Sequence, residues 1–249
     1  MTEPDPGAAA YRALQQRARR DGRAAQELME LYVLEGFLAR LSISPLREQF
    51  VLKGGVLLAA FGNRRPTRDV DLSASQTSND AANVLGLIRE ILSVELGVDD
   101  GLVVEFDSLA AEVIRDEDQY SGVRVSARAT LDRARLSFHI DVNVGDPIYP
   151  EPTTVDVPRL LDGDPIRLRG YSMHMVLADK IVTAIQRGTV NTRWRDFGDI
   201  WTLTRHHEVD GGALQEAISV VAHHRSAQLA PLIEALDGYA DIGQTKWAN

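Results

Sequence analysis

Two different spacings of apolar residues divide the first half of the chain into helical and extended stretches. From about Tyr11 to Leu41 the pattern is helical, with apolar residues at steps of three and four: Leu28, Leu31, Tyr32, Leu34 and Leu38. A helical spacing returns from Asn79 to Leu96, a stretch that begins with an asparagine–aspartate pair suited to capping. After Gly97 valine-rich segments alternate with a period of two. These patterns predict helices in the first two stretches and strands at 101–109, 121–131 and 135–144.

The second half of the chain is typical of a helical region. Between Gly145 and Gly170 prolines are frequent and the periodicity fades, so we expect a connection there with one further strand around Ile166 to Leu168. From Ser172 onward the apolar spacing predicts helices at roughly 172–187, 194–206, 212–225 and 227–237. Strands followed by helices predict an α+β fold. We expect one lobe over residues 1–165, with a helical N-terminal lead-in, and a helical lobe over 166–249.

Two aspartates stand one residue apart on a segment that otherwise resembles a buried strand. In "RDVDLSA", Asp69 and Asp71 alternate with two apolar residues, so both carboxylates share one face of the strand. Like charges at that separation repel, and a divalent cation would remove the conflict. For an isolated D-x-D pattern, a solvent-facing edge strand is the simpler alternative.

A second strand carries a third carboxylate. The polar face of "RLSFHIDVNV" includes His139 and Asp141. The segment "DVNVGD" has valines at alternate positions and lacks the final glutamate of a calcium-binding loop. Asp69, Asp71 and Asp141 instead predict a site for two Mg²⁺ or Mn²⁺ ions, the arrangement used for in-line attack on a phosphate. His139 is expected to be a satisfied strand histidine.

A glycine pair precedes the aspartates. Lys53, Gly54 and Gly55, followed by "VLLAAFG", predict a turn that opens a short helix, where backbone N–H groups and the helix dipole favour phosphate. Neither G-x-x-x-x-G-K-[ST] nor G-x-G-x-x-G occurs, which excludes a P-loop and a Rossmann dinucleotide site.

Charged residues in the helical half occupy defined helix faces. In "LADKIVTAIQRG", Lys180, Thr183 and Arg187 lie beside the packing stripe, on a face that could meet a triphosphate. In "RWRDFGDIW", Asp196 and Asp199 are three apart and therefore neighbours on a helix, where one could hold Lys180 or Arg187. The alternatives are an ordinary amphipathic helix with two surface cations for the first segment and a capped helix start with a solvated carboxylate for the second; without the three acids the former would be preferred.

Composition narrows the class of protein. The 249 residues are 44% hydrophobic and 25% charged, which is ordinary for a globular protein. Because the chain has no cysteine, any metal must be held by carboxylates or histidines. No apolar run is long enough for a membrane helix, so we expect a cytoplasmic protein without a membrane partner. The net charge of −9 restricts nucleic-acid binding to local basic clusters.

Four segments occur in the order of a known family: "KGGVLLAAFG…RRPTRDVDL", "YSGVRV", "FHIDVNVGDPIYP" and "LADKIVTAIQR…RWRDFGDIW". Over roughly Phe50 to Trp201 the chain resembles the AbiEii family of nucleotidyltransferase toxins, including the mycobacterial MenT group. The resemblance implies a polymerase-beta-type nucleotidyltransferase lobe with a mixed sheet, followed by a helical C-terminal lobe. It also implies an NTP substrate, a cognate antitoxin, and action on RNA or nucleotides in toxin–antitoxin or phage-defence systems.

The resemblance also assigns roles to individual positions. It matches the glycine pair to a phosphate-binding turn, the three aspartates to metal ligands, and Asp196 with Asp199 to a D-x-x-D motif. The expected catalytic residues are Asp69, Asp71, Asp141, Lys180 and Asp196. The expected nucleotide-binding residues are Lys53, Gly54, Gly55, Arg65, Thr67, Lys180 and Arg187. One departure is Val56, where the family often has threonine or serine, so that a hydroxyl contact to the triphosphate is absent.

These observations favour an enzyme that joins an NMP from an NTP to an acceptor hydroxyl and releases pyrophosphate. By analogy with the family we expect the acceptor to be the 3′ end of an RNA, and specifically a tRNA. Basic residues near the acids are expected to line its path in a cleft between the lobes: Arg64, Arg65, Arg68, Arg187, Arg193 and Arg195. The alternatives are nucleotidylation of a small molecule or a protein hydroxyl, and a catalytically degenerate domain that binds a partner.

Overall fold

The chain divides into two compact units. The computed structural model describes residues 5–75, 77–115 and 121–247, so Tyr120 of the "YSGVRV" motif lies outside the described residues. One unit comprises residues 1–145 and 154–170, and the other comprises residues 146–153 and 171–249. The predicted α+β fold is confirmed, since the first unit contains a sheet and the second is helical. None of the helices in the described ranges is long and apolar enough to cross a membrane.

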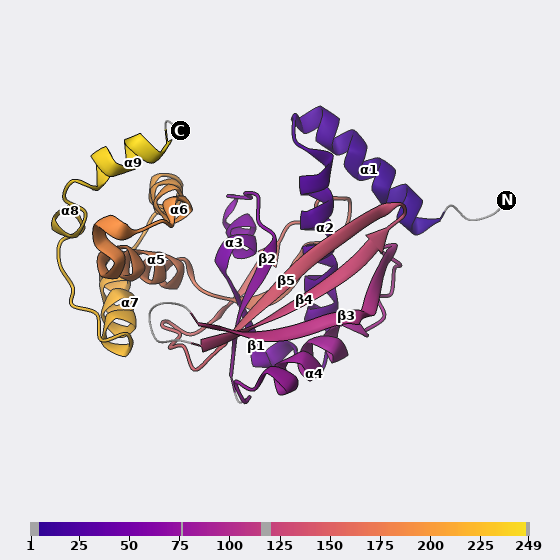
Figure 1. The fold of residues 1–249 in the computed structure, drawn as a ribbon, viewed down its shortest axis with the longest axis horizontal. Coiled ribbons are helices and arrows are strands. Elements are labelled where there is room, and N and C mark those ends of the chain that lie inside the picture. The colour runs from indigo at the N-terminus through magenta and orange to yellow at the C-terminus, as the bar shows by residue number, and fades with distance from the viewer. Residues whose placement is uncertain (1–4, 76, 116–120, 248–249) are drawn as a thin grey trace. The chain divides into compact units, whose positions relative to one another are not determined.

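A mixed sheet forms the centre of the first unit (Figure 1). Within the described residues its strands are β1 (Phe50–Lys53), β2 (Asp69–Ala74), β3 (Leu102–Arg115), β4 (Ser121–Leu131), β5 (Ala134–Val144), β6 (Thr153–Val157) and β7 (Ile166–Gly170). Their order across the sheet is β3-β4-β5-β2-β1-β7-β6. β2 runs parallel to β5 and β1 runs parallel to β7, whereas β1–β2, β3–β4 and β4–β5 are antiparallel. This order places β2 between β1 and β5.

Two helices, α2 (Ala25–Ile43) and α4 (Ala81–Leu92), pack on one face of this sheet and on each other. The side chains that β2, β4 and β5 present to that face are fully buried: Val70, Leu72, Val123, Val125, Ile140 and Val142. Burial of each such side chain contributes about 1.5–3 kcal/mol to folding. The apolar side chains of these strands therefore point towards the helices, and the polar side chains that alternate with them lie on the opposite face of the sheet.

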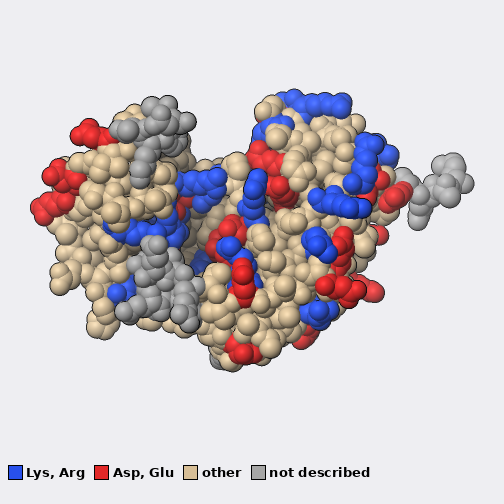
Figure 2. All heavy atoms as spheres, in the orientation of Figure 1, with Lys and Arg blue, Asp and Glu red and all other residues tan. Residues whose placement is uncertain are grey.

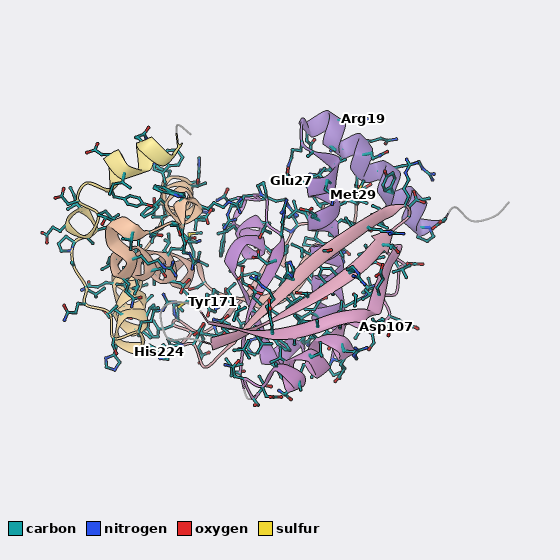
Figure 3. All side chains as sticks on the ribbon, in the orientation of Figure 1. Arg19, Glu27, Met29, Asp107, Tyr171 and His224 are labelled. Atoms are coloured by element: carbon teal, nitrogen blue, oxygen red, sulfur yellow. The ribbon has the colours of Figure 1, made fainter. Side chains whose placement is uncertain are left out.

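The N-terminal helical stretch differs from the sequence expectation at one point. Instead of continuing from Tyr11 to Leu41, it forms α1 (Pro6–Asp21) and α2, because Gly22 adopts a left-handed conformation with φ of 64° that ends α1. Figure 2 shows basic side chains gathered over α1, and Figure 3 shows Arg19 on this helix and Asp107 on β3. The arginines of α1 that face solvent, including Arg12 and Arg19, form a solvated surface.

The second unit is built around α5 (Met173–Arg187), which contacts α6 (Trp194–His206), α7 (Gly211–His224) and α8 (Leu232–Ala235). The last helix is α9 (Tyr239–Trp247). The helix expected at 227–237 is reduced to the single turn of α8, since Pro231 directly precedes it. Short helical turns complete the chain: α3 (Gly54–Leu57), η1 (Arg47–Gln49), η2 (Leu58–Phe61) and η3 (Gly188–Val190).

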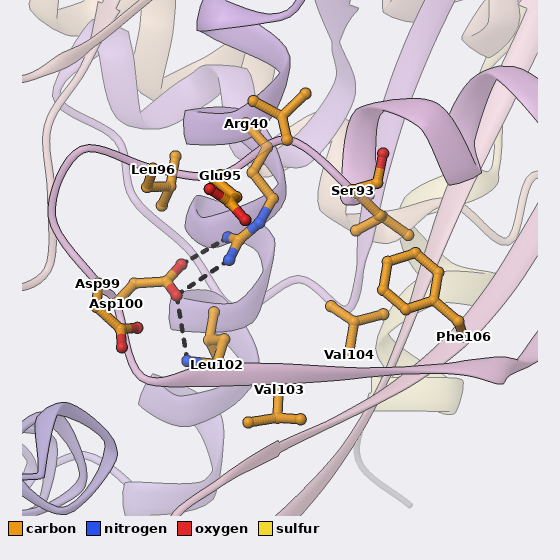
Figure 4. Close-up of a pocket in the computed structure, with 12 residues that line it drawn as sticks. Arg40, Ser93, Glu95, Leu96, Asp99, Asp100, Leu102, Val103, Val104 and Phe106 are labelled. Carbon is orange, nitrogen blue, oxygen red and sulfur yellow. Dashed lines mark hydrogen bonds and ion pairs between the residues drawn. The ribbon is translucent and has the colours of Figure 1, made fainter.

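An open pocket of about 520 Å³ lies beside the start of β3 (Figure 4). The guanidinium of Arg40 forms a fork with the carboxylate of Asp100 at 2.6 and 3.1 Å, and Asp100 also accepts the N–H of Leu102. These charges are therefore satisfied by each other and by the backbone. The carboxylates that the sequence singled out are elsewhere, on β2 and β5.

Candidate active site

Three carboxylates lie on the polar face of two neighbouring strands. In the parallel pairing of β2 with β5, Asp71 is directly opposite Asp141, and Asp69 is opposite His139. Residues two apart on a strand share a face, so all three aspartates project to the side away from α2 and α4. Asp141 is only 7% exposed, and Asp69 and Asp71 are half-buried. We call this surface of β2, β4 and β5 the acid face.

The glycine turn between β1 and α3 directly contacts the acid face. Gly54 has a φ of +67°, and a Cβ atom added there would lie 1.8 Å from Oδ2 of Asp71. The N–H of Gly55 donates a hydrogen bond to the Asp71 carboxylate. Gly54 is therefore required both by its backbone conformation and by the space that the aspartate occupies.

A hydrogen bond links the loop before β2 to Asp69. The hydroxyl of Thr67 donates to Oδ1 of Asp69 at 2.6 Å, and Thr67 is 7% exposed. A Cβ atom added at Gly55 would lie 2.9 Å from the Thr67 hydroxyl and 3.4 Å from a guanidinium nitrogen of Arg65. Thr67 and Arg65, both expected to bind the nucleotide, thus stand beside the glycine turn.

We expect Gly54→Ala to lower the free energy of unfolding by about 2 kcal/mol more than Gly62→Ala. Both glycines have positive φ, but nothing lies within 4 Å of a Cβ added at Gly62, so the control isolates the collision with Asp71. Urea unfolding of both variants measures the difference. Adding Asp71→Ala to Gly54→Ala should recover part of the loss. Equal destabilisation by the two glycine variants would contradict the close contact.

Burial and neighbouring charge perturb the central carboxylate. Loss of hydration, together with the nearby charges of Asp69 and Asp141, raises the pKa of Asp71 to about 6. The charge of Lys53 and the hydrogen bond from Gly55 act in the opposite direction. The fold therefore holds three acids together at an electrostatic cost, a pattern common at functional sites.

Two cations partly neutralise the acids from the flanking strands. Arg124 of β4 donates from Nε to Oδ1 of Asp141 at 2.8 Å and from Nη2 to Oδ2 at 2.7 Å. Lys53 of β1 is opposite Asp71 in the sheet register. Two adjacent aspartates flanked by a cation on each side thus form a row across four neighbouring strands, in the order Arg124, Asp141, Asp71 and Lys53. The pKa of Arg124 is raised, chiefly by its hydrogen bonds to Asp141.

Arg124 was missed at the sequence level, although a signal for it exists. β4 and β5 are joined by two residues, Asp132 and Arg133, and Leu131 pairs with Ala134. Counting outward from that turn places Arg124 opposite Asp141. A hairpin of this loop length has a fixed register, so the pairing could have been derived once the turn was recognised.

The aspartates fit a divalent cation by donor type and by strand register. Carboxylate oxygens are the ligands that Mg²⁺ and Mn²⁺ prefer, and a cation would relieve the repulsion that raises the pKa of Asp71. As the side chains stand, with Asp141 held by Arg124, no group of three acidic or histidine side chains in the described residues is arranged to hold an ion. The metal site stays a prediction. His139 is satisfied, since its Nδ1 lies 3.0 Å from the hydroxyl of Ser126.

Lys180 is the centre of a buried ion cluster in the helical unit. Its Nζ donates to Oδ1 of Asp196 and, at 2.9 Å, to Oδ2 of Asp199. The three residues are 6%, 5% and 3% exposed. Arg193 donates to the other oxygen of Asp196 at 2.6 Å. The D-x-x-D motif therefore holds Lys180 between α5 and α6, while contact of Lys180 with a phosphate stays a prediction.

The three arginines before Asp69 differ in environment. Arg64 donates to Glu35 at 2.5 Å and to the carbonyl of Pro158, and Glu35 is 2% exposed. Arg64 thus anchors this loop to α2. The side chain of Arg68 is 81% exposed and lies 3.3 Å from Glu30. Arg64 is thus held within the fold, whereas the side chain of Arg68 faces solvent.

Residues 36–248 match the family model described as nucleotidyl transferase AbiEii toxin, type IV TA system. No match to a curated protein was found. Two solved structures share the fold at 16% sequence identity. JHP933 from Helicobacter pylori aligns with a TM-score of 0.50, covering 89% of this chain and 92% of that one. MenT4, the nucleotidyltransferase toxin Rv2826c from Mycobacterium tuberculosis H37Rv, aligns with a TM-score of 0.53, covering 88% of this chain and 74% of that one. Because the family model spans most of the sequence, including the acid face and the Lys180 cluster, the chain belongs to the AbiEii family of nucleotidyltransferase toxins.

Proposed function

We propose that this nucleotidyltransferase transfers an NMP from an NTP to the 3′ hydroxyl of a tRNA in a reaction that requires Mg²⁺ or Mn²⁺. The observation that carries the proposal is the register of β2 with β5, which sets Asp69, Asp71 and Asp141 on one face beside the glycine turn. Membership of a type IV toxin–antitoxin family implies an NTP substrate and an antitoxin partner.

The aspartates would hold the metal ions, Asp69 and Asp71 from β2 and Asp141 from β5. When bound, such ions neutralise the phosphate oxygens and favour the ionised form of the attacking hydroxyl. The acceptor oxygen forms a bond to the α-phosphorus, the bond from that phosphorus to the bridging oxygen breaks, and pyrophosphate leaves. The chain contributes mainly position and charge, as is usual for phosphoryl transfer.

The glycine turn is the proposed contact for the triphosphate. Gly54 and Gly55 present backbone without side chains next to Asp71, and Lys53 and Arg65 add positive charge beside them. Val56 lacks a hydroxyl, so the backbone and these cations supply the contacts. In the helical unit we assign Lys180 and Arg187 to NTP binding by family resemblance, with Asp196 and Asp199 orienting Lys180.

Two arginines close to Asp69 support an RNA acceptor. Arg68 is highly exposed, and Arg65 stands beside the glycine turn, so both are placed to meet phosphates. A free RNA end brings its hydroxyl to the acids without the need to open a duplex. An acidic protein with local arginines of this kind binds RNA through few phosphate contacts.

The test is extension of tRNA with each labelled NTP in the presence of Mg²⁺, using RNA with a free or a chemically blocked 3′ hydroxyl. We expect label only on the free end, and none with Asp71→Asn. Arg65→Ala combined with Arg68→Ala should reduce the salt dependence of RNA binding by roughly one unit of slope for each arginine that binds a phosphate. Equal labelling of the blocked RNA would reject the 3′ end and favour a small-molecule or protein acceptor.

A further inference from the structure

Arg124 holds the carboxylate of Asp141, one of the three proposed metal ligands. Both oxygens of Asp141 accept hydrogen bonds from its guanidinium, at 2.8 and 2.7 Å. The Asp141 side chain is 10% exposed, whereas the Arg124 side chain is 34% exposed. The acid is therefore fixed within the sheet, and the arginine is the partner with access to solvent.

A divalent cation and this guanidinium compete for the same oxygens. An ion bound to Asp141 would stand within a few ångströms of the positive charge of Arg124, and repulsion at that distance is strong in a partly buried site. Carboxylate–guanidinium forks are also among the stronger hydrogen-bonded pairs. Metal binding to all three acids therefore requires Arg124 to move or to share Asp141 at an electrostatic cost.

A triphosphate offers Arg124 an alternative partner of the same geometry. The planar fork of arginine matches phosphate oxygens as well as it matches a carboxylate. Arg124 is in the same row of the sheet as Asp71, beside which the glycine turn lies. A phosphate chain near that turn would attract the guanidinium and leave Asp141 free for the metal.

We propose that Arg124 binds Asp141 until a nucleoside triphosphate arrives and then binds its phosphates, so that metal and nucleotide enter the site together. The inference rests on the proposed role of the three aspartates as metal ligands. It assigns Arg124 as a nucleotide-binding residue that also suppresses binding of metal alone. A residue that merely positioned Asp141 would help metal and nucleotide alike.

Competition with the metal and mere positioning of Asp141 predict opposite changes in the Mn²⁺ affinity of Arg124→Gln. If Arg124 competes with the metal, Mn²⁺ alone should bind the variant about 5- to 150-fold more tightly than the wild type, the usual range of coupling between two ligands. The preformed complex of Mn²⁺ with inorganic triphosphate should bind it more weakly. Arg124→Lys keeps the charge without the fork, and its Mn²⁺ affinity should lie between the two.

Arg128→Gln is the matched control. Arg128 lies further along the same strand and pairs with Glu105 at 3.0 Å, away from the three aspartates. Its substitution should leave both affinities within about twofold of the wild type, since exposed ion pairs have small effects. Electron paramagnetic resonance reports free and bound Mn²⁺, and thermal unfolding verifies that each variant is folded.

The outcomes separate this inference from the proposed function. Unchanged or weaker Mn²⁺ binding by Arg124→Gln and Arg124→Lys overturns the inference. If the variants bind both Mn²⁺ and the complex of Mn²⁺ with triphosphate more weakly, Arg124 has a positioning role and the inference is likewise overturned. If Asp71→Asn binds Mn²⁺ as well as the wild type in the presence of triphosphate, the metal site itself is wrong and the proposed function fails. Tighter Mn²⁺ binding with weaker triphosphate binding supports the inference.

Discussion

Asp71→Asn is expected to lower nucleotide transfer by about 10³-fold or more, while making the metal-free protein more stable at neutral pH. The loss follows from removing one of the three carboxylates that the proposed metal site requires. The gain follows from the raised pKa of Asp71, about 6 in the folded protein against 3.8 for an ordinary aspartate. The substitution therefore lowers activity and raises stability, as expected where a fold holds like charges together.

The stability gained by Asp71→Asn is expected to increase with pH. The folded protein binds the Asp71 proton more tightly than the unfolded chain does, so ionisation of this carboxyl destabilises the fold. The destabilisation is absent below about pH 3.8, grows as the pH rises, and is complete above about pH 6. The difference between these two pKa values corresponds to at most about 3 kcal/mol of stability. Solvent screening lowers this in a half-buried site, so we expect Asp71→Asn to raise the free energy of unfolding by about 1–3 kcal/mol.

Urea unfolding of wild type and Asp71→Asn between pH 4 and pH 8, without metal, measures this difference. Asp107→Asn, at an exposed aspartate on β3, is the control and should change stability little at any pH. Mg²⁺ added together with inorganic triphosphate should stabilise the wild type more than Asp71→Asn, because a protein is stabilised only by a ligand that it binds. A stability difference that is constant with pH, or that favours the wild type at neutral pH, would contradict the electrostatic cost assigned to the three aspartates of the acid face.

Lys180→Met is expected to destabilise the helical unit by about 3–5 kcal/mol. The substitution keeps most of the apolar volume of the side chain but leaves the carboxylates of Asp196 and Asp199 buried without their ammonium partner. Arg193→Met removes a neighbouring cation that contacts the same Asp196, yet its side chain is 42% exposed, so its loss should cost at most about 1 kcal/mol.

Thermal and urea unfolding followed by circular dichroism compare these variants. Combining Lys180→Met with Asp196→Asn and Asp199→Asn should restore much of the stability, because no buried charge is then unpaired. If Lys180→Met folds as stably as the wild type and loses only NTP binding, the lysine acts on the nucleotide and not as the centre of the cluster.

Strand alternation was sufficient to predict which residues share the acid face. In β2 and β5 each apolar residue alternates with a polar one, so the period alone separates Asp71 and Asp141 from Leu72 and Val142. It could not show that Arg124 holds Asp141, because that contact depends on pairing between strands. Nor could it show that Arg64 is tied to Glu35, since these residues meet only when the loop packs on α2.

The missed elements have local causes. β6 lies in the proline-rich connection, and its five residues are too few for a clear period. A single helix is predicted across Gly22, and the break between α1 and α2 becomes clear from the positive φ of this residue. α9 follows the one-turn α8, and its sequence has only a weak apolar periodicity. Where the pattern is long and uninterrupted, as in α5 and β5, sequence and structure agree closely.

The two-residue turn between β4 and β5 also bears on the order of folding. Hairpins with short connections form in roughly microseconds, whereas pairing of distant segments is slower because a long loop must close first. Arg124 and Asp141 belong to such a hairpin, while β2 lies much earlier in the chain than β5 and must join it in parallel. We therefore expect Asp141 to be paired with Arg124 before β2 brings Asp69 and Asp71 to the sheet. In that order of folding, the ion pair between Arg124 and Asp141 reduces the repulsion that β2 meets when its two aspartates join the sheet.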